Sequence, residues 1–117
     1  MDGRVLTAVD HGREIGLGVG GEVTIRLAEN LSTGYAWELV ELDDRLLRVV
    51  ANRHLPGPPG IGRAGLREVV LEAVTTGAGR IALRLRRAWD PPDVEVDRFE
   101  VGIEIAAILP PPGGADN

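Results

Sequence analysis

The stretch Asn30-Leu31-Ser32-Thr33-Gly34-Tyr35, followed at once by Ala36-Trp37, separates two runs in which apolar and polar residues alternate. Residues 22–28 lie before it and residues 36–41 after it. A period of two is typical of half-buried strands, so we expect the stretch to be the loop of a hairpin. It contains the only serine, and it groups the only tyrosine and one of the two tryptophans beside a glycine. A chain so poor in aromatic residues rarely does this for packing alone, and we interpret the stretch as the tip of a binding surface.

Further strand-like runs lie on both sides of this stretch, divided by turns rich in glycine and proline. The predicted strands are residues 5–8, 22–28, 36–41, 47–53, 66–76, 80–87 and 97–106. Residues 14–21 resemble a short strand plus a turn, and residues 41–47 fit one helical turn or a bend equally well. About seven short strands, with no long amphipathic helix and no internal repeat, predict an all-β sandwich. We expect a single domain over residues 1–109 and a disordered tail over residues 110–117.

Composition and charge restrict the classes of function. Hydrophobic residues make up 44% of the chain and charged residues 26%, as in an ordinary soluble domain. Cysteine is absent, which excludes disulfides, thiolate metal sites and cysteine nucleophiles. The net charge of −5 argues against nucleic acid as a partner, because that binding depends on neutralising phosphates. No apolar run is long enough for a membrane span and the start lacks the apolar region of a secretory signal, so a cytoplasmic location is the default expectation.

Three unusual connections are expected at one end of the sandwich. If successive strands run in opposite directions, the second, fourth and sixth connections share an end, and these are residues 30–35, 54–65 and 87–96. The first carries Tyr35 and the third carries Trp89, while the middle one contains three prolines and four glycines and is predicted to be a long flexible loop. Aromatic side chains beside an adaptable backbone favour a protein-binding surface, although this pattern does not identify the partner.

The same three loops carry motifs of a known family. The motifs N-P-T-T-G-[YF]-x-W, G-x-G-G and R-P-W correspond, in this order, to residues 30–37, Gly62-Arg63-Ala64-Gly65 and Arg87-Ala88-Trp89. Residues 97–101 also resemble the last strand of the family. Over nearly its whole length, the chain resembles the chagasin-type (inhibitor family I42) inhibitors of papain-like cysteine proteases. The resemblance implies an immunoglobulin-like β-sandwich that acts as a monomeric, reversible inhibitor of such a protease, without cofactor, metal or catalytic residues.

The resemblance also implies where the protease binds. The first loop would enter the cleft at the catalytic cysteine and histidine, with Ser32 and Thr33 facing the catalytic centre, and the other two loops would lie on either side. Gly34 would supply a positive φ, Trp89 would be the main apolar contact, and Arg87 would orient its loop or pair with acidic groups of the protease. The implied protease-binding residues are Asn30, Leu31, Ser32, Thr33, Gly34, Tyr35, Gly62, Arg63, Ala64, Gly65, Arg87, Ala88 and Trp89.

The chain departs from the family motifs at three positions. Leu31 and Ala88 replace prolines, and Ala64 replaces a glycine. Losing a compatible proline frees the unbound loop and costs about 0.4–1 kcal/mol at each site, so we expect weaker inhibition than with the prolines. Tyr35 and Trp37 are left open, since core packing beneath the loop is at least as plausible for them as contact with the protease.

Other signals in the sequence indicate alternatives. Residues 60–65 spell G-x-G-x-x-G, but prolines precede them and a strand-like run follows, so a dinucleotide site is rejected. Ser32 as a nucleophile would need His11 or His54 as a base within hydrogen-bond reach. The acidic residues between 90 and 97 match no calcium-binding spacing and indicate a solvated loop, and the arginines at 80, 84 and 86 indicate an exposed face paired with carboxylates. The main alternative to an inhibitor is an immunoglobulin-like module that binds another protein.

Overall fold

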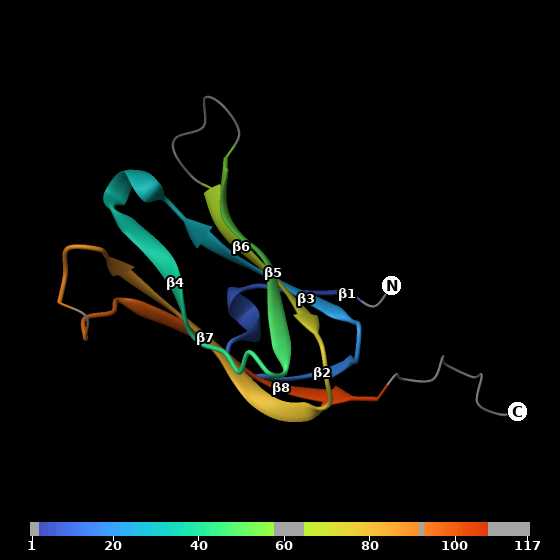
Figure 1. Ribbon diagram of the computed structural model, residues 1–117. Coiled ribbons are helices and arrows are strands. Elements are labelled where there is room, and N and C mark those ends of the chain that lie inside the picture. Colours follow the sequence, from blue (N-terminus) through green and yellow to red (C-terminus); the bar gives the residue numbers. More distant parts are fainter. Residues whose placement is uncertain (1–2, 58–64, 92, 108–117) are drawn as a thin grey trace, which may run out of the picture.

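Two packed β-sheets make up the protein in the computed structural model, which describes residues 3–57, 65–91 and 93–107 (Figure 1). One sheet has the order β1-β3-β6-β5, formed by Gly3–Leu6, Glu22–Glu29, Gly65–Ala73 and Leu47–Pro56. The other has the order β2-β8-β7-β4, formed by Glu14–Gly18, Asp97–Ala106, Gly77–Arg87 and Tyr35–Glu41. Two 3-10 turns, η1 (Ala8–Asp10) and η2 (Leu31–Thr33), complete the described structure. The expected all-β sandwich is confirmed.

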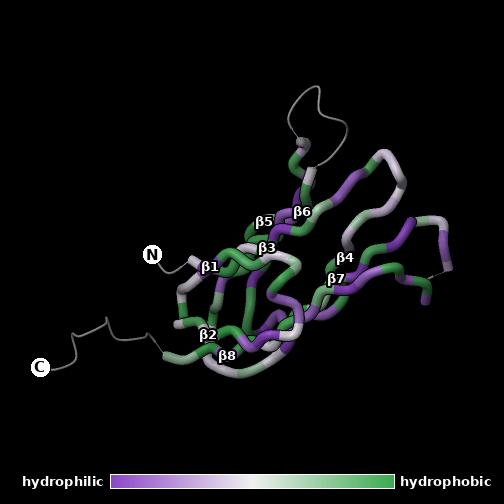
Figure 2. Tube along the Cα trace, turned by 180° about the vertical axis from the view of Figure 1, so that it is seen from behind, coloured by the Kyte–Doolittle hydropathy of each residue, from purple (hydrophilic) through white to green (hydrophobic). Residues whose placement is uncertain are grey.

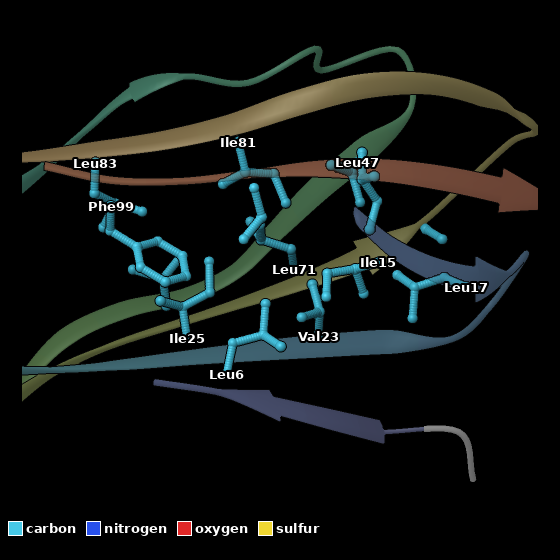
Figure 3. Packing of buried hydrophobic residues seen from close by; sticks show 14 of the residues in the cluster. Leu6, Ile15, Leu17, Val23, Ile25, Leu47, Leu71, Ile81, Leu83 and Phe99 are labelled. Carbon is cyan, nitrogen blue, oxygen red and sulfur yellow. The ribbon is translucent and has the colours of Figure 1, made fainter. Parts of the chain in front are cut away.

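The core lies between the two sheets, where the inward residues of the strands meet. Figure 2 shows hydrophobic and hydrophilic residues alternating along the strands, and Figure 3 shows Ile25 and Phe99, from different sheets, reaching into the same interior. Both of these side chains are at most 1% exposed. Full burial of such a side chain contributes about 1.5–3 kcal/mol, so this layer supplies the main stabilisation of the fold. The described residues contain no helix that is long and apolar enough to cross a membrane.

The prediction of a hairpin around residues 30–35 is wrong. β3 pairs with β1 and β6, whereas β4 pairs with β7 in the opposite sheet. The chain therefore crosses from one sheet to the other over η2. The alternation of polar and apolar residues shows that each of these strands buries one face. Because both sheets bury a face in the same core, the alternation does not show with which strand each one pairs.

Several other boundaries differ from the prediction. The loop predicted over residues 54–65 is shorter, because β5 continues to Pro56 and β6 begins at Gly65, directly opposite Pro56. β5 lies at the edge of its sheet, where a proline is tolerated because one side of the strand has no neighbour. The short strand expected within residues 14–21 is confirmed as β2, which pairs in parallel with β8. The segment after β4 is a turn, in which the Leu46 amide donates to the Asp43 carbonyl at 3.0 Å. The predicted tail, residues 110–117, lies outside the described residues.

The directions of the strands place the three connections at one end of the sandwich. β3 and β5 both run antiparallel to β6, and β4 and β8 both run antiparallel to β7. In Figure 1 the β3–β4 and β7–β8 connections lie at the same end of the molecule, which is also where β5 ends and β6 begins. The expected convergence is thus confirmed for the described residues.

Candidate functional site

The first loop is a compact turn that its own side chains close. Oδ1 of Asn30, the residue before η2, accepts hydrogen bonds from the backbone N of Ser32 at 3.1 Å and from its Oγ at 2.7 Å. Oγ1 of Thr33 donates to the carbonyl of Asn30 at 2.7 Å and accepts from the amide of Tyr35 at 3.3 Å. Such side-chain caps satisfy backbone groups at the ends of a turn. The two hydroxyls expected to face a protease are therefore engaged within the loop, and they fix its shape.

Gly34 ends this turn and supports the side chain of Trp89. Its φ is +86°, and its amide donates to the carbonyl of Leu31 at 3.0 Å. A Cβ built on Gly34 would lie 2.3 Å from Cη2 and 3.0 Å from Cζ2 of Trp89. Carbon atoms normally approach no closer than about 3.5 Å, so the indole of Trp89 lies directly against the backbone of Gly34. Only glycine combines this φ with this approach.

Arg87 fixes the third loop. It is the last residue of β7 and lies opposite Tyr35. Its guanidinium is 5.0 Å from the ring centroid of Tyr35 and 5.5 Å from that of Trp89, within the range of cation–π attraction. Its Nε and Nη2 donate to the carboxylate of Asp90 at 3.1 and 3.3 Å. The amide of Asp90 donates to the carbonyl of Arg87 at 3.1 Å, which closes a β-turn with Ala88 and Trp89 at its centre.

Two exposed apolar side chains belong to the resulting surface, which consists of residues 30–35 and 87–89 and which we call the loop rim. Trp89 is 68% exposed and Leu31 is 46% exposed. Trp89 rests on Gly34 and borders Arg87, so its position is supported although most of it is accessible to solvent. Apolar side chains presented in this way are suited to burial in a partner.

The middle loop contributes only its ends to the described structure, since Gly62, Arg63 and Ala64 lie outside the described residues. Gly65 is the first residue of β6 and pairs with both Glu29 and Pro56. A Cβ on Gly65 would lie 2.4 Å from the carbonyl oxygen of Leu55 and 2.9 Å from Nε2 of His54. Gly65 is therefore needed for packing within its own sheet.

The two aromatic residues whose roles the sequence left open lie beneath the rim. Trp37 is 8% exposed, and its indole Nε1 donates to the carbonyl of Ala28 at 2.9 Å. It belongs to the core and ties β4 to β3 across the two sheets. Tyr35 is half-buried, and its ring faces the guanidinium of Arg87. Trp37 thus packs in the core, and Tyr35 supports the third loop.

Sequence reasoning missed a buried carboxylate below the loops. Glu29 is 3% exposed and accepts hydrogen bonds from the Trp37 amide at 2.7 Å, from Nε of Arg67 at 3.1 Å and from Nδ1 of His54 at 2.7 Å. Burial raises the pKa of this carboxyl, but the hydrogen bonds from Trp37, Arg67 and His54 outweigh burial, so its pKa lies below the ordinary value of 4.5. A signal was present in the sequence, because Glu29 continues the inward positions of residues 23, 25 and 27.

The serine and the two histidines that a catalytic site would require each bind a different partner. Ser32 Oγ bonds to Asn30, His54 bonds to Glu29, and Nδ1 of His11 accepts from the amide of Glu100 at 3.0 Å. The described residues therefore form no serine–histidine pair of the kind that nucleophilic catalysis requires.

The charged residues outside the rim are mostly paired. Asp90 pairs with Arg87 and Glu95 with Arg98, and across the described ranges no group of three or more His, Cys, Asp or Glu residues could hold a metal ion. The expected pairing of the arginines with carboxylates is confirmed for Arg80 with Glu100 and for Arg84 with Glu38. The expected exposure is wrong for Arg86, whose side chain is only 11% exposed.

The fold and the rim define a class of protein, a β-sandwich that presents converging loops at one end for binding to a partner. The family model described as "Chagasin family peptidase inhibitor I42" matches residues 17–103. The chain belongs to the chagasin family of peptidase inhibitors. Membership confirms the broad function expected from the resemblance, which is that of a protein inhibitor of peptidases and not of an enzyme.

Individual relatives agree with this assignment. Amoebiasin-1 of Entamoeba histolytica is 32% identical over 88 residues, which are 74% of this chain and 84% of that protein. The crystal structure of the cysteine protease inhibitor EhICP2 from Entamoeba histolytica superimposes with a TM-score of 0.82 at 24% identity, covering 91% of this chain and 97% of that one. PbICP-C, solved in complex with falcipain-2, gives a TM-score of 0.62 at 14% identity, covering 91% of both chains. The last two likenesses show that the immunoglobulin-like sandwich is shared.

Proposed function

We propose that this chain inhibits a papain-like cysteine protease reversibly, by placing the loop rim in the active-site cleft. The observation that carries the proposal is the seating of Trp89 on Gly34, which joins the first and third loops into one surface. Among the structural neighbours, EhICP2 is described as a cysteine protease inhibitor, and PbICP-C was solved in complex with falcipain-2. These neighbours, together with family membership, support the class of the partner.

The first loop is suited to a central position in the cleft because it is already ordered. Asn30, Ser32 and Thr33 close it through their own hydrogen bonds. A loop that is rigid before binding loses little conformational freedom on association. The exposed side chain of Leu31 adds an apolar contact at the tip of this loop. No covalent bond to the protease is required, so the inhibitor can dissociate from the cleft without chemical change.

The third loop supplies the large apolar contact at the side of the cleft. Trp89 is amphipathic, largely exposed and supported from below, which is how the side chains that dominate interface energies are usually presented. Arg87 acts within the inhibitor, because its guanidinium faces Tyr35 and Trp89 and pairs with Asp90. This contact pattern supports the role of Arg87 in orienting the loop, one of the two roles that the resemblance implies for it.

Titration against papain, with substrate turnover as the readout, tests the proposal. Trp89→Ala should raise the inhibition constant by about 30-fold or more, equivalent to about 2 kcal/mol for a hot-spot side chain. Val74→Ala is the matched control, because Val74 is 42% exposed and follows β6 at the end of the sandwich opposite the rim. An unchanged inhibition constant for Trp89→Ala would contradict the proposed contact. Absence of inhibition by the wild type at micromolar concentration would favour the binding module without inhibitory activity.

A further inference from the structure

We propose that Glu29 is the positioning residue of the loop rim, because its buried carboxylate joins both ends of the first loop to the strands that carry the middle loop. The inference rests on the proposed function, since its effect is measured as protease inhibition. The side chain of Glu29 is 0% exposed and does not reach a partner. Any influence of Glu29 on binding must therefore act through the loops around it.

Glu29 closes the first loop where strand pairing does not. It is the last residue of β3, while Trp37 lies near the start of β4 in the opposite sheet. No ladder hydrogen bond connects these two strands, because they belong to different sheets. Oε2 of Glu29 accepts from the amide of Trp37 at 2.7 Å, and the carbonyl of Ala28 accepts from the indole of Trp37 at 2.9 Å. The carboxylate thus sets the distance between the two ends of the loop.

The same carboxylate reaches the strands on both sides of the middle loop. Its Oε1 accepts from Nδ1 of His54, which lies near the end of β5, at 2.7 Å. Arg67, which lies near the start of β6, approaches both oxygens at 3.1 Å. An ionised carboxylate only accepts hydrogen bonds, so Nδ1 of His54 is the donor whether the ring is neutral or charged. The carboxylate of Glu29 therefore connects the strands that flank the first loop with the strands that flank the middle loop.

This arrangement couples the geometry of the loops. Binding of a rigid rim requires that the loops already hold their relative positions, since any ordering on association reduces affinity. A neutral amide in place of the carboxylate cannot accept from all of these donors, because its NH₂ group would face a donor. Glu29→Gln is therefore expected to loosen the bases of the first and middle loops together while the core between the sheets remains packed.

The adjacent strand provides a matched control. Glu68 of β6 is 4% exposed and accepts from Nε of Arg26 at 3.1 Å and from Nη2 of Arg53 at 2.7 Å. Arg26, Arg53 and Glu68 lie opposite one another in a single sheet, whose strands ladder hydrogen bonds already join. Glu68→Gln also removes a low-exposure carboxylate from two arginines, but it breaks no connection to β4.

The experiment compares Glu29→Gln and Glu68→Gln as inhibitors of papain, after circular dichroism and urea unfolding show that both are folded. Glu29→Gln should raise the inhibition constant by about 10-fold or more, equivalent to about 1.4 kcal/mol, and Glu68→Gln should change it by less than about 2-fold. Amide hydrogen exchange supplies a second readout, because the amide of Trp37 should lose protection in Glu29→Gln and keep it in Glu68→Gln.

A second pair of variants keeps the test decisive if Glu29→Gln does not fold. His54→Leu removes one donor to the carboxylate and should weaken inhibition, whereas His54→Gln keeps a donor and should restore most of it. Three results would overturn the role of Glu29 and leave the proposed function in place. These are an unchanged inhibition constant for Glu29→Gln, an equal loss of inhibition in Glu68→Gln, and equal losses of inhibition in both His54 variants. A wild type that does not inhibit papain-like proteases would overturn the proposed function and this inference with it.

Discussion

Replacing Gly34 by alanine tests how the first and third loops are joined. Two costs follow from the structure. A φ of +86° is unfavourable for an alanine by about 1–2 kcal/mol, and the added methyl group would lie 2.3 Å from Cη2 of Trp89. The first cost destabilises the turn, and the second forces the indole out of its position. Because a displaced hot-spot side chain forfeits about 2 kcal/mol or more, Gly34→Ala should raise the inhibition constant by about 30-fold.

Gly12→Ala separates these two costs. Gly12 has a nearly identical φ of +87°, but a Cβ there would meet no atom within 4 Å. Urea unfolding should therefore show a comparable loss of stability, by about 1–2 kcal/mol, from the backbone strain in both variants. Titration against papain should show a loss of inhibition in Gly34→Ala only. Unchanged inhibition by Gly34→Ala, or an equal loss in Gly12→Ala, would refute the claim that the seat of Trp89 on Gly34 shapes the binding surface.

Two further predictions concern loop rigidity and pH. Leu31→Pro and Ala88→Pro should each stabilise the free protein by about 0.4–1 kcal/mol in urea unfolding and tighten inhibition by about 2- to 5-fold. Leu31 is the first residue of η2 after an extended Asn30, and Ala88 is the second residue of a β-turn. Proline is favoured at both kinds of position. A loss of stability in either variant would contradict these backbone assignments. The lowered pKa of Glu29, held by Trp37, Arg67 and His54, means that its stabilisation is present above pH 4.5 and is lost as pH falls through the folded-state pKa. The stability difference between wild type and Glu29→Gln should therefore shrink in urea unfolding below about pH 4.5, and a difference that grows there would contradict the assignment.

Much of the fold could be predicted from local patterns. The alternation at residues 81–85 and 99–105 predicted β7 and β8, and segments rich in glycine and proline indicated where strands end. Pairing could not be predicted in the same way. The alternation of β3 and β4 is compatible with a hairpin and with a crossing between sheets, and only the packing of the whole chain decides between them.

The candidate site was predictable where a backbone requirement selects one residue type. The family resemblance implied a positive φ at Gly34 and an apolar contact at Trp89, and the structure has a positive φ at Gly34 and an exposed Trp89. The contact between these two residues was not predictable, because it joins loops more than 50 residues apart in the chain. Glu29 was missed for a related reason, since an inward carboxylate is stable only with donors that distant strands supply.

Protection of the catalytic cysteine of papain from alkylation tests the central claim most directly. If the loop rim fills the cleft, an equimolar amount of this protein should slow the reaction of that thiol with iodoacetamide in step with the loss of substrate turnover. Trp89→Ala at the same concentration should protect less, and Val74→Ala should protect like the wild type. A complex in which the thiol reacts at the rate of the free enzyme would contradict the account, because the protein would then bind away from the cleft.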